Sequence, residues 1–118
     1  MIDINKNLKS YKYAVKGLKH LLVFENNARI HLAATVLVLA LSAYFRIEKT
    51  EWLWILLAIT LVWTMELINT AIEKIVDFLS PEFHPAAGKI KDLAAAAVLI
   101  AAIFALIVGV IIFQEYMF

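Results

Sequence analysis

The sequence has no cysteine and very little glycine or proline, and each shortage narrows what the protein can be. Without cysteine, disulfides, thiolate metal ligands and thiol nucleophiles are excluded. Only three glycines and two prolines occur in 118 residues, so no stretch has the composition of a linker. We therefore interpret residues 1–118 as a single domain.

Charge is also scarce, whereas apolar residues are abundant. The formal net charge is +1, which argues against a nucleic-acid-binding protein. Hydrophobic residues make up 64% of the chain, far above the roughly 45–50% that is typical of soluble domains. This composition indicates a membrane protein.

The first 27 residues have the periodicity of an amphipathic helix. Apolar residues recur in steps of three and four over residues 4–22. The other faces carry Lys6, Lys9, Lys12, Lys16 and Lys19. Such a helix lies on a membrane surface, where lysines meet lipid phosphates and the apolar stripe meets acyl chains. We predict a surface helix over residues 4–27; the alternative is a soluble helix that packs on a partner.

Three apolar stretches follow, each close to the roughly 20 residues that a helix needs to cross a bilayer. They predict spans at approximately residues 28–47, 51–70 and 93–113. Six basic residues precede the first span, two lie between the first and second, three lie between the second and third, and none follows the third. The positive-inside rule therefore predicts a cytoplasmic N-terminus and an outer C-terminus.

The second span continues as a helix into a polar stretch with one charged face. At about 100° per residue, Glu66, Asn69, Glu73 and Asp77 fall within an arc of roughly 80°. Ionisable residues at the end of an apolar span indicate a functional site. Glu73 is the natural ligand for Mg²⁺ shared with nucleotide phosphates. Glu66 is nearest the membrane, so it could accept the proton of a lipid hydroxyl.

Two further polar groups could complete a nucleotide site. Glu25 and Arg29, at the start of the first span, offer a carboxylate and a guanidinium for phosphate. The loop over residues 80–85 leads to Lys89 and Lys91, whose charges also suit phosphate. Taken alone, the first group is better explained by interfacial solvation, and the second by an ordinary helix connection with positive-inside lysines. No P-loop, glycine-rich kinase loop or zinc motif is present.

From the residues alone, three kinds of function remain open. The carboxylate stripe could serve a kinase that binds MgATP at the cytoplasmic face, where ATP is found. It could line an ion or proton pathway. It could also be a polar seam that fixes helix packing in a structural subunit of a larger membrane complex.

Residues 66–77 resemble the signature of the prokaryotic diacylglycerol kinase family, E-x-x-N-[ST]-A-I-E-x-x-x-D. Residues 14–18, Glu25 with Arg29, and residues 82–84 and 91–99 resemble other family segments, in the same order and spacing. The resemblance covers residues 6 to 113. It implies an all-α membrane protein in which each chain of a homotrimer has one surface helix and three transmembrane helices, with active sites shared between neighbouring chains.

The same resemblance implies roles for single residues. Glu66 resembles the catalytic base that contacts the lipid, and Asn69 its orienting partner. Glu25 and Glu73 resemble the ligands of a Mg²⁺ ion on the phosphates of the co-substrate ATP, and Ala95 matches a position against the lipid. Other matched positions surround the nucleotide, namely Lys6, Tyr13, Glu82, His84, Lys91 and Asp92. Lys6 stands where some relatives carry arginine, which makes a phosphate contact there monodentate.

The implied activity is transfer of the ATP γ-phosphate to the hydroxyl of a lipid alcohol in the bacterial cytoplasmic (inner) membrane. The family contains diacylglycerol kinases, which make phosphatidic acid, and undecaprenol kinases, which make undecaprenyl phosphate. His31, Pro85 and Ala95 are more similar to the undecaprenol branch. The diacylglycerol branch often has an acidic residue, a non-proline residue and a serine at these positions. The pattern leans towards undecaprenol, and diacylglycerol stays open as the acceptor.

Overall fold

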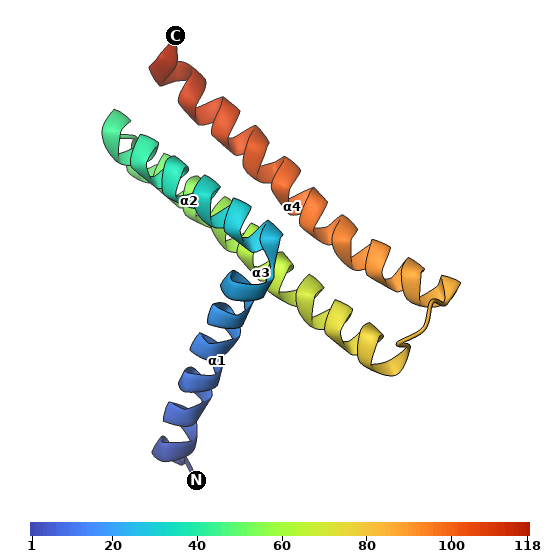
Figure 1. Cartoon of the computed structure of the whole chain (residues 1–118). Helices are drawn as coiled ribbons and strands as arrows, with labels where there is room; N and C mark the ends of the chain where they lie inside the picture. Colours follow the sequence, from blue (N-terminus) through green and yellow to red (C-terminus); the bar gives the residue numbers. More distant parts are fainter.

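The computed structural model describes all 118 residues, which form four α-helices and no strand. The helices are α1 (Ile4–Phe24), α2 (Asn26–Phe45), α3 (Lys49–Leu79) and α4 (Pro85–Met117). Figure 1 shows α3 and α4 as a long antiparallel pair, with α2 alongside α3 and α1 projecting away from the other helices. The prediction of an all-helical protein is confirmed.

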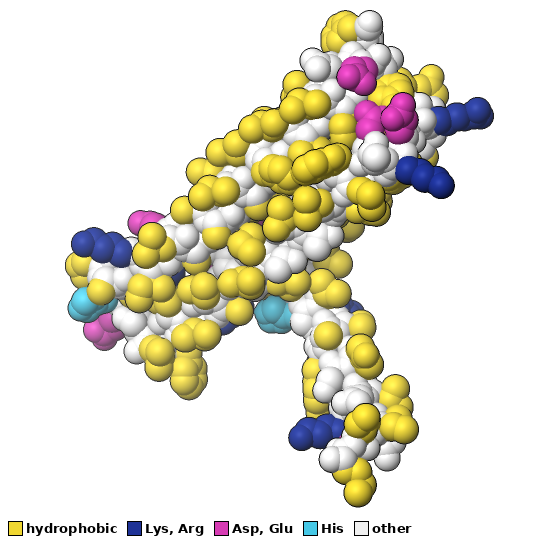
Figure 2. Space-filling view, turned by 180° about the vertical axis from the view of Figure 1, so that it is seen from behind, with side chains coloured by type: hydrophobic (Ala, Val, Ile, Leu, Met, Phe, Trp, Pro, Cys, Tyr) yellow, Lys and Arg dark blue, Asp and Glu magenta, His cyan; other side chains and the backbone are white.

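Three of the helices, α2, α3 and α4, are long and apolar enough to cross a membrane. With 31 and 33 residues, α3 and α4 are about 46 and 50 Å long, whereas the hydrocarbon core of a bilayer is about 30 Å thick. Each therefore extends past the core, and in α3 the polar end beyond Glu66 is the part that does so. Figure 2 shows apolar side chains covering the long body, with charged groups near its ends and on α1.

The corner between α1 and α2 differs from the sequence-based expectation. The helix predicted over residues 4–27 ends at Phe24, because Glu25 has an extended backbone with φ −105° and ψ 118°. The Arg29 side chain stabilises this break from the next helix. Its Nε donates to the carbonyl of Leu22 at 3.1 Å, and its guanidinium also donates to the carbonyl of Val23. These carbonyls belong to the last turn of α1, which lacks partners within the helix.

Polar contacts also fix the opposite end of the molecule. Arg46 ends α2 in the left-handed conformation with φ 52°. Glu48 and Glu51 form a capping box at the start of α3, in which Glu51 accepts a hydrogen bond from the Glu48 amide at 3.0 Å. The hydroxyl of Tyr116 donates to the same Glu51 carboxylate. The end of α4 is therefore attached to the turn between α2 and α3.

The main core lies between α3 and α4 near this end. It consists of Ile47, Ile55, Ala58, Val108, Ile112 and Phe113. Small residues along the helix pair, such as Ala94 and Ala101 on α4, are buried and permit close approach of the backbones. Only 16 of the 118 residues are buried, so most of the apolar surface faces outward, as expected of helices that contact lipid or other chains.

Candidate functional site

The centre of the candidate site is one face of α3 that is buried although it is polar. Glu66 is 2% exposed, and Asn69 and Thr70 are each 7% exposed. Three oxygen atoms on this face have no hydrogen-bond partner: Glu66 Oε2, Asn69 Oδ1 and Thr70 Oγ1. Buried polar groups are nearly always paired, and an unpaired one costs about 1–3 kcal/mol. Such a cluster indicates that a ligand supplies the missing partners.

Two side chains hold the acidic groups of this face. The Nε2 atom of His31, on α2, lies 3.4 Å from Oε2 of Glu66. The Nδ2 atom of Asn69 donates to Oε1 of Glu73 at 3.2 Å. The helical spacing predicted from the sequence therefore places Glu66, Asn69 and Glu73 on one face, and α2 adds a histidine to them.

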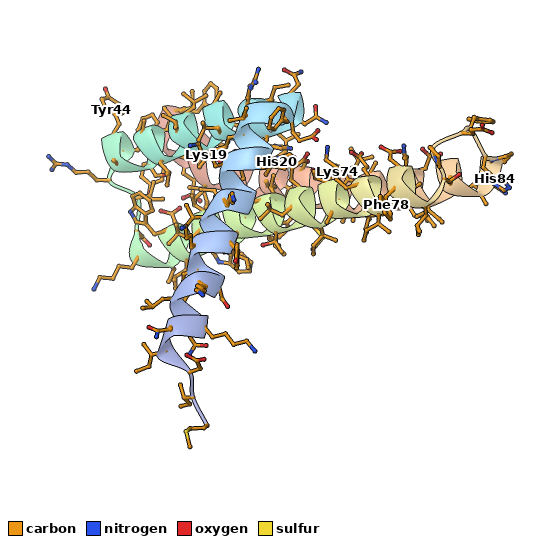
Figure 3. The ribbon with its side chains drawn as sticks, turned by 60° about the horizontal axis from the view of Figure 1, so that its bottom comes forward. Lys19, His20, Tyr44, Lys74, Phe78 and His84 are labelled. Carbon is orange, nitrogen blue, oxygen red and sulfur yellow. The ribbon has the colours of Figure 1, made fainter.

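Glu25 approaches this face from the corner between α1 and α2. Its Oε1 atom lies 4.0 Å from Nζ of Lys74, the residue after Glu73. Glu25 and Glu73 are the two carboxylates that act electrostatically on Glu66. Figure 3 shows Lys74 on the part of α3 beside the end of α1. The four residues Glu25, Glu66, Asn69 and Glu73 are thus gathered by the fold of a single chain.

The donor set fits a magnesium ion that is shared with a nucleotide. No three His, Asp or Glu side chains converge as a complete metal site. Mg²⁺ commonly takes only one or two carboxylates and completes its shell with phosphate oxygens and water. Glu25, at the corner between α1 and α2, and Glu73, on the polar part of α3, provide two carboxylates that suit such an ion.

The residues at the start of α4 form a second group, away from Glu66. Lys91 makes an ion pair with Asp77 of α3, so its ammonium group already has a partner within the chain. Asp92 and Ala95 are exposed on α4. Glu82 is exposed in the connection between α3 and α4.

His84 has a structural role in this chain. Its Nδ1 atom accepts a hydrogen bond from the Ala86 amide at 3.1 Å and so caps the N-terminus of α4. Figure 3 shows His84 at the far end of the α3–α4 pair, beyond Lys74 and Phe78. Glu66 and Ser80 are separated by 14 residues of helix, or about 21 Å. A single chain therefore does not bring His84 or Glu82 to Glu66.

The remaining predicted nucleotide contacts lie on α1. Lys6 and Tyr13 are exposed, and neither side chain forms a hydrogen bond or ion pair with α3. The backbone amide of Lys6 donates to Oδ1 of Asp3 at 3.1 Å, so Asp3 caps the N-terminus of α1. One chain thus assembles the acidic centre and leaves Lys6, Tyr13, Glu82 and His84 at its periphery.

Two polar side chains of the centre, Thr70 and His31, were not assigned to the site from the sequence: Thr70 was part of the family signature, and His31 was used only to compare the two branches of the family. Thr70 follows Glu66 by four residues, a spacing that puts both on one helix face, so its position was open to prediction. The contact of His31 with Glu66 depends on how α2 packs against α3. No sequence spacing indicates that packing, because the two residues are 35 positions apart.

An apolar cavity of about 550 Å³ runs along the membrane-spanning helices beside the centre. His31 and Thr35 line its polar end, and the rest of the lining is almost wholly apolar and comes from α2, α3 and α4. Gln114 and Phe118 lie at its opposite end, near the C-terminus. Glu66, Asn69 and Thr70 do not line the cavity, and His31 is the residue that both lines it and contacts Glu66.

Comparison with known proteins places this arrangement in a family. The family model described as prokaryotic diacylglycerol kinase matches residues 12–113. The chain is 36% identical to the undecaprenol kinase of Bacillus subtilis over 94% of this chain and 90% of that protein. It is 40% identical to a diacylglycerol kinase of Helicobacter pylori over 81% and 75%, and 31% identical to that of Escherichia coli over 92% and 89%. The chain therefore belongs to the prokaryotic diacylglycerol kinase family.

Proposed function

We propose that the protein is a lipid kinase in which Glu66 activates the hydroxyl of a membrane lipid alcohol towards the γ-phosphate of MgATP. The observation that carries this proposal is the cluster of three buried, unpaired oxygens on one face of α3. Two of them, on Glu66 and Asn69, can only accept hydrogen bonds, and the Thr70 hydroxyl can accept or donate. An alcohol O–H supplies one donor, which Glu66 can accept, and its own oxygen can accept from Thr70.

Glu66 acts as general base in this account. Phosphoryl transfer needs the attacking hydroxyl to be positioned and its proton to be accepted as the new bond forms. Oε2 of Glu66 is buried and free to accept. Asn69 donates its amide nitrogen to Glu73, so it joins the proposed metal ligand to the turn of α3 that carries Glu66.

Glu25 and Glu73 would hold Mg²⁺ on the ATP phosphates. An ion held there would neutralise charge on the phosphates. Along α3, Glu73 lies seven residues beyond Glu66, which is about 10 Å of helix rise. The carboxylate for the hydroxyl and the carboxylate for the metal are thus on one face, with the base on the membrane side.

The hydrocarbon tail of the acceptor lies in the apolar cavity that begins at His31. The cavity does not include Glu66 itself, but His31 lines it and contacts Glu66, and the cavity runs from there along the spanning helices. Its lining suits an acyl or polyprenyl chain. The named relatives act on diacylglycerol or on undecaprenol, and both are alcohols with a primary hydroxyl and a long apolar tail. The residues at positions 31, 85 and 95 favour undecaprenol.

The working protein is a homotrimer in the bacterial cytoplasmic membrane, with α1 on the cytoplasmic surface. Exposed apolar residues of α1, such as Leu8 and Val15, support this placement because lysines occupy its other faces. The predicted nucleotide contacts lie apart from one another within a single chain, which supports active sites that are shared between neighbouring chains. A neighbouring chain can bring Tyr13 or His84 to an acidic centre that its own chain does not reach.

A proton or ion pathway fits the structure less well. Such a pathway needs polar groups on both sides of Glu66. Towards the C-terminal end of α4, the polar groups near Glu66 end at Thr35 and Trp63, and apolar side chains line the cavity beyond them.

The test is release of ADP by the purified protein in mixed micelles that contain diacylglycerol, undecaprenol or no lipid alcohol. The proposal predicts Mg²⁺-dependent ADP release that requires one of the two alcohols, together with radiolabelled phosphate in the lipid fraction. ADP release that is indifferent to lipid, or absent with both alcohols, would contradict it. Comparison of the two lipids identifies the acceptor in the same experiment.

A further inference from the structure

We propose, on the basis that Glu66 is the base proposed above, that His31 is a positioning residue for Glu66 and that Thr35 and Trp63 fix His31 between α2 and α3. The imidazole orients the Glu66 carboxylate towards the acceptor hydroxyl. The inference goes beyond the proposed chemistry because His31 contacts the base and not the phosphates or the metal.

The contact between His31 and Glu66 has the geometry of a hydrogen bond that is not yet tightened. Nε2 of His31 lies 3.4 Å from Oε2 of Glu66, whereas N–H···O bonds are usually 2.7–3.2 Å long. The two side chains are 19% and 3% exposed, so little water competes for the contact. Catalytic hydrogen bonds are often long without substrate and shorten when it binds.

His31 is also the favourable electrostatic neighbour of this carboxylate. Three titratable groups act on Glu66: His31 from α2, Glu73 from α3 itself and Glu25 from the corner between α1 and α2. The two carboxylates repel an ionised Glu66, whereas the His31 imidazole can offer it an N–H donor. Without His31, the carboxylate would have repelling neighbours only, and its orientation would be less well defined.

A pair of hydrogen bonds fixes the backbone that carries His31. The Thr35 hydroxyl donates to the carbonyl of His31 at 2.7 Å. It accepts from Nε1 of Trp63 at 2.9 Å, and Trp63 precedes Glu66 by three residues on α3. The two hydrogen bonds therefore join the turn of α2 that holds His31 to the turn of α3 that holds Glu66.

The test compares two replacements of His31 in the full-length protein. His31→Gln keeps an N–H donor at nearly the same distance from the backbone as Nε2, whereas His31→Leu removes the donor. We expect His31→Leu to lower kcat about 10–100-fold, the scale of a small misplacement at a reacting group, and to leave the KM for ATP unchanged. We expect His31→Gln to recover most of that loss. Thr35→Val, which removes the link to Trp63, should give a smaller fall in kcat.

A matched control comes from another histidine. His20 is exposed on α1, where its ring packs on Phe24 at a centroid distance of 4.7 Å. His20→Leu should leave kcat unchanged. Thermal unfolding and oligomeric state of each variant, measured in the same detergent, separate a loss of positioning from a loss of folding.

A double-mutant comparison separates this inference from the role of Glu66 itself. If His31 acts through Glu66, His31→Leu should cause no further loss when Glu66 is already Gln. Full kcat in His31→Leu, or an equal loss in the Gln and Leu variants, would overturn the role of His31. Normal turnover in Glu66→Gln would instead overturn the proposed base, whatever the His31 variants do.

Discussion

At the scale of single residues, the site is distinguished by polar atoms that the fold buries without pairing them. Glu66 is almost fully buried, yet Oε2 has no hydrogen-bond partner. A buried carboxylate without a full set of hydrogen-bond partners lowers the stability of the fold. Such a loss of stability is retained at positions that function requires. The unpaired oxygens of Asn69 and Thr70 belong to the same turn, which is why we interpret the three atoms as one binding site.

Thr70 tests this interpretation without touching the proposed base. Thr70→Val replaces the hydroxyl by a methyl group of similar shape. If the hydroxyl binds the acceptor, its loss should raise the KM for lipid about tenfold, the scale of one hydrogen bond of about 1.4 kcal/mol. Thr70→Ser should retain binding. The protein should unfold at the same or a higher temperature, because an unpaired buried group has been removed. An unchanged KM for lipid in Thr70→Val would exclude the contact.

Glu25 and Glu73 are expected to affect metal-dependent nucleotide binding. The variants Glu25→Gln and Glu73→Gln keep the shape of each side chain but lose the charge that faces Mg²⁺ and the phosphates. Each should weaken ATP binding and shift its dependence on Mg²⁺ to higher concentration. The measurement is ATP affinity over a magnesium titration, with oligomeric state checked in parallel. Wild-type magnesium dependence in both variants would remove these residues as ligands.

The spacing of Glu66, Asn69 and Glu73 was sufficient to predict their shared face, because helical periodicity fixes positions within one helix. The contact between His31 and Glu66 was not predictable in that way. It depends on the packing of α2 on α3, which involves residues 35 positions apart. Likewise, the residue type of His84 does not indicate that its side chain caps the N-terminus of α4. That contact depends on the local backbone conformation.

At the scale of helices, the corner at Glu25 determines how the surface helix meets the rest of the molecule. The apolar repeat extends over residues 4–22, and the prediction carried the helix on to residue 27. The structure breaks it at Glu25 and stabilises the break through Arg29. The Arg29 guanidinium, which suited phosphate on sequence grounds, is therefore engaged with backbone carbonyls, and the same corner places the Glu25 carboxylate near Lys74.

The cavity between the spanning helices gives a prediction for the acceptor tail. Ala34 lines it, whereas its neighbour Ala33 is exposed and does not. Ala34→Leu should partly fill the cavity and raise the KM for lipid several-fold, with no change in the KM for ATP. Ala33→Leu is the matched control and should leave both constants unchanged. Loss of the trimer in Ala34→Leu, rather than a change in KM, would mean that a second copy of the chain occupies the cavity.

At the scale of the whole molecule, the predicted site residues divide into a centre and a periphery. Glu25, Glu66, Asn69 and Glu73 are assembled by one chain, whereas residues of α1 and of the α3–α4 connection lie apart from them. Apolar stretches and the positive-inside count predicted three long helices and their direction. They did not indicate which chain of an oligomer brings the peripheral residues to a given acidic centre. The periodicity of one helix does not encode contacts between copies of the chain.

The absence of cysteine allows a direct test of the orientation. Thr50 is exposed in the first turn of α3, and Phe83 is exposed in the connection that follows the other end of this helix. Thr50→Cys and Phe83→Cys therefore each introduce one unique thiol. Cytoplasmic placement of the N-terminus predicts that a membrane-impermeant maleimide labels Thr50→Cys in intact cells and labels Phe83→Cys only after lysis. The cysteine-free parent protein is the control. The reverse labelling pattern would place the acidic centre away from ATP.

The most direct measurement is the turnover of Glu66→Gln on the preferred lipid, made alongside MgATP affinity and oligomeric state. If Glu66 is the base, turnover should fall about 10²–10⁴-fold, the usual scale for loss of a general base, while MgATP affinity and oligomeric state stay as in the wild type. Glutamine keeps the hydrogen-bonding capacity of the side chain, so a purely structural role predicts little change. Near-normal turnover in an intact Glu66→Gln oligomer would contradict the account.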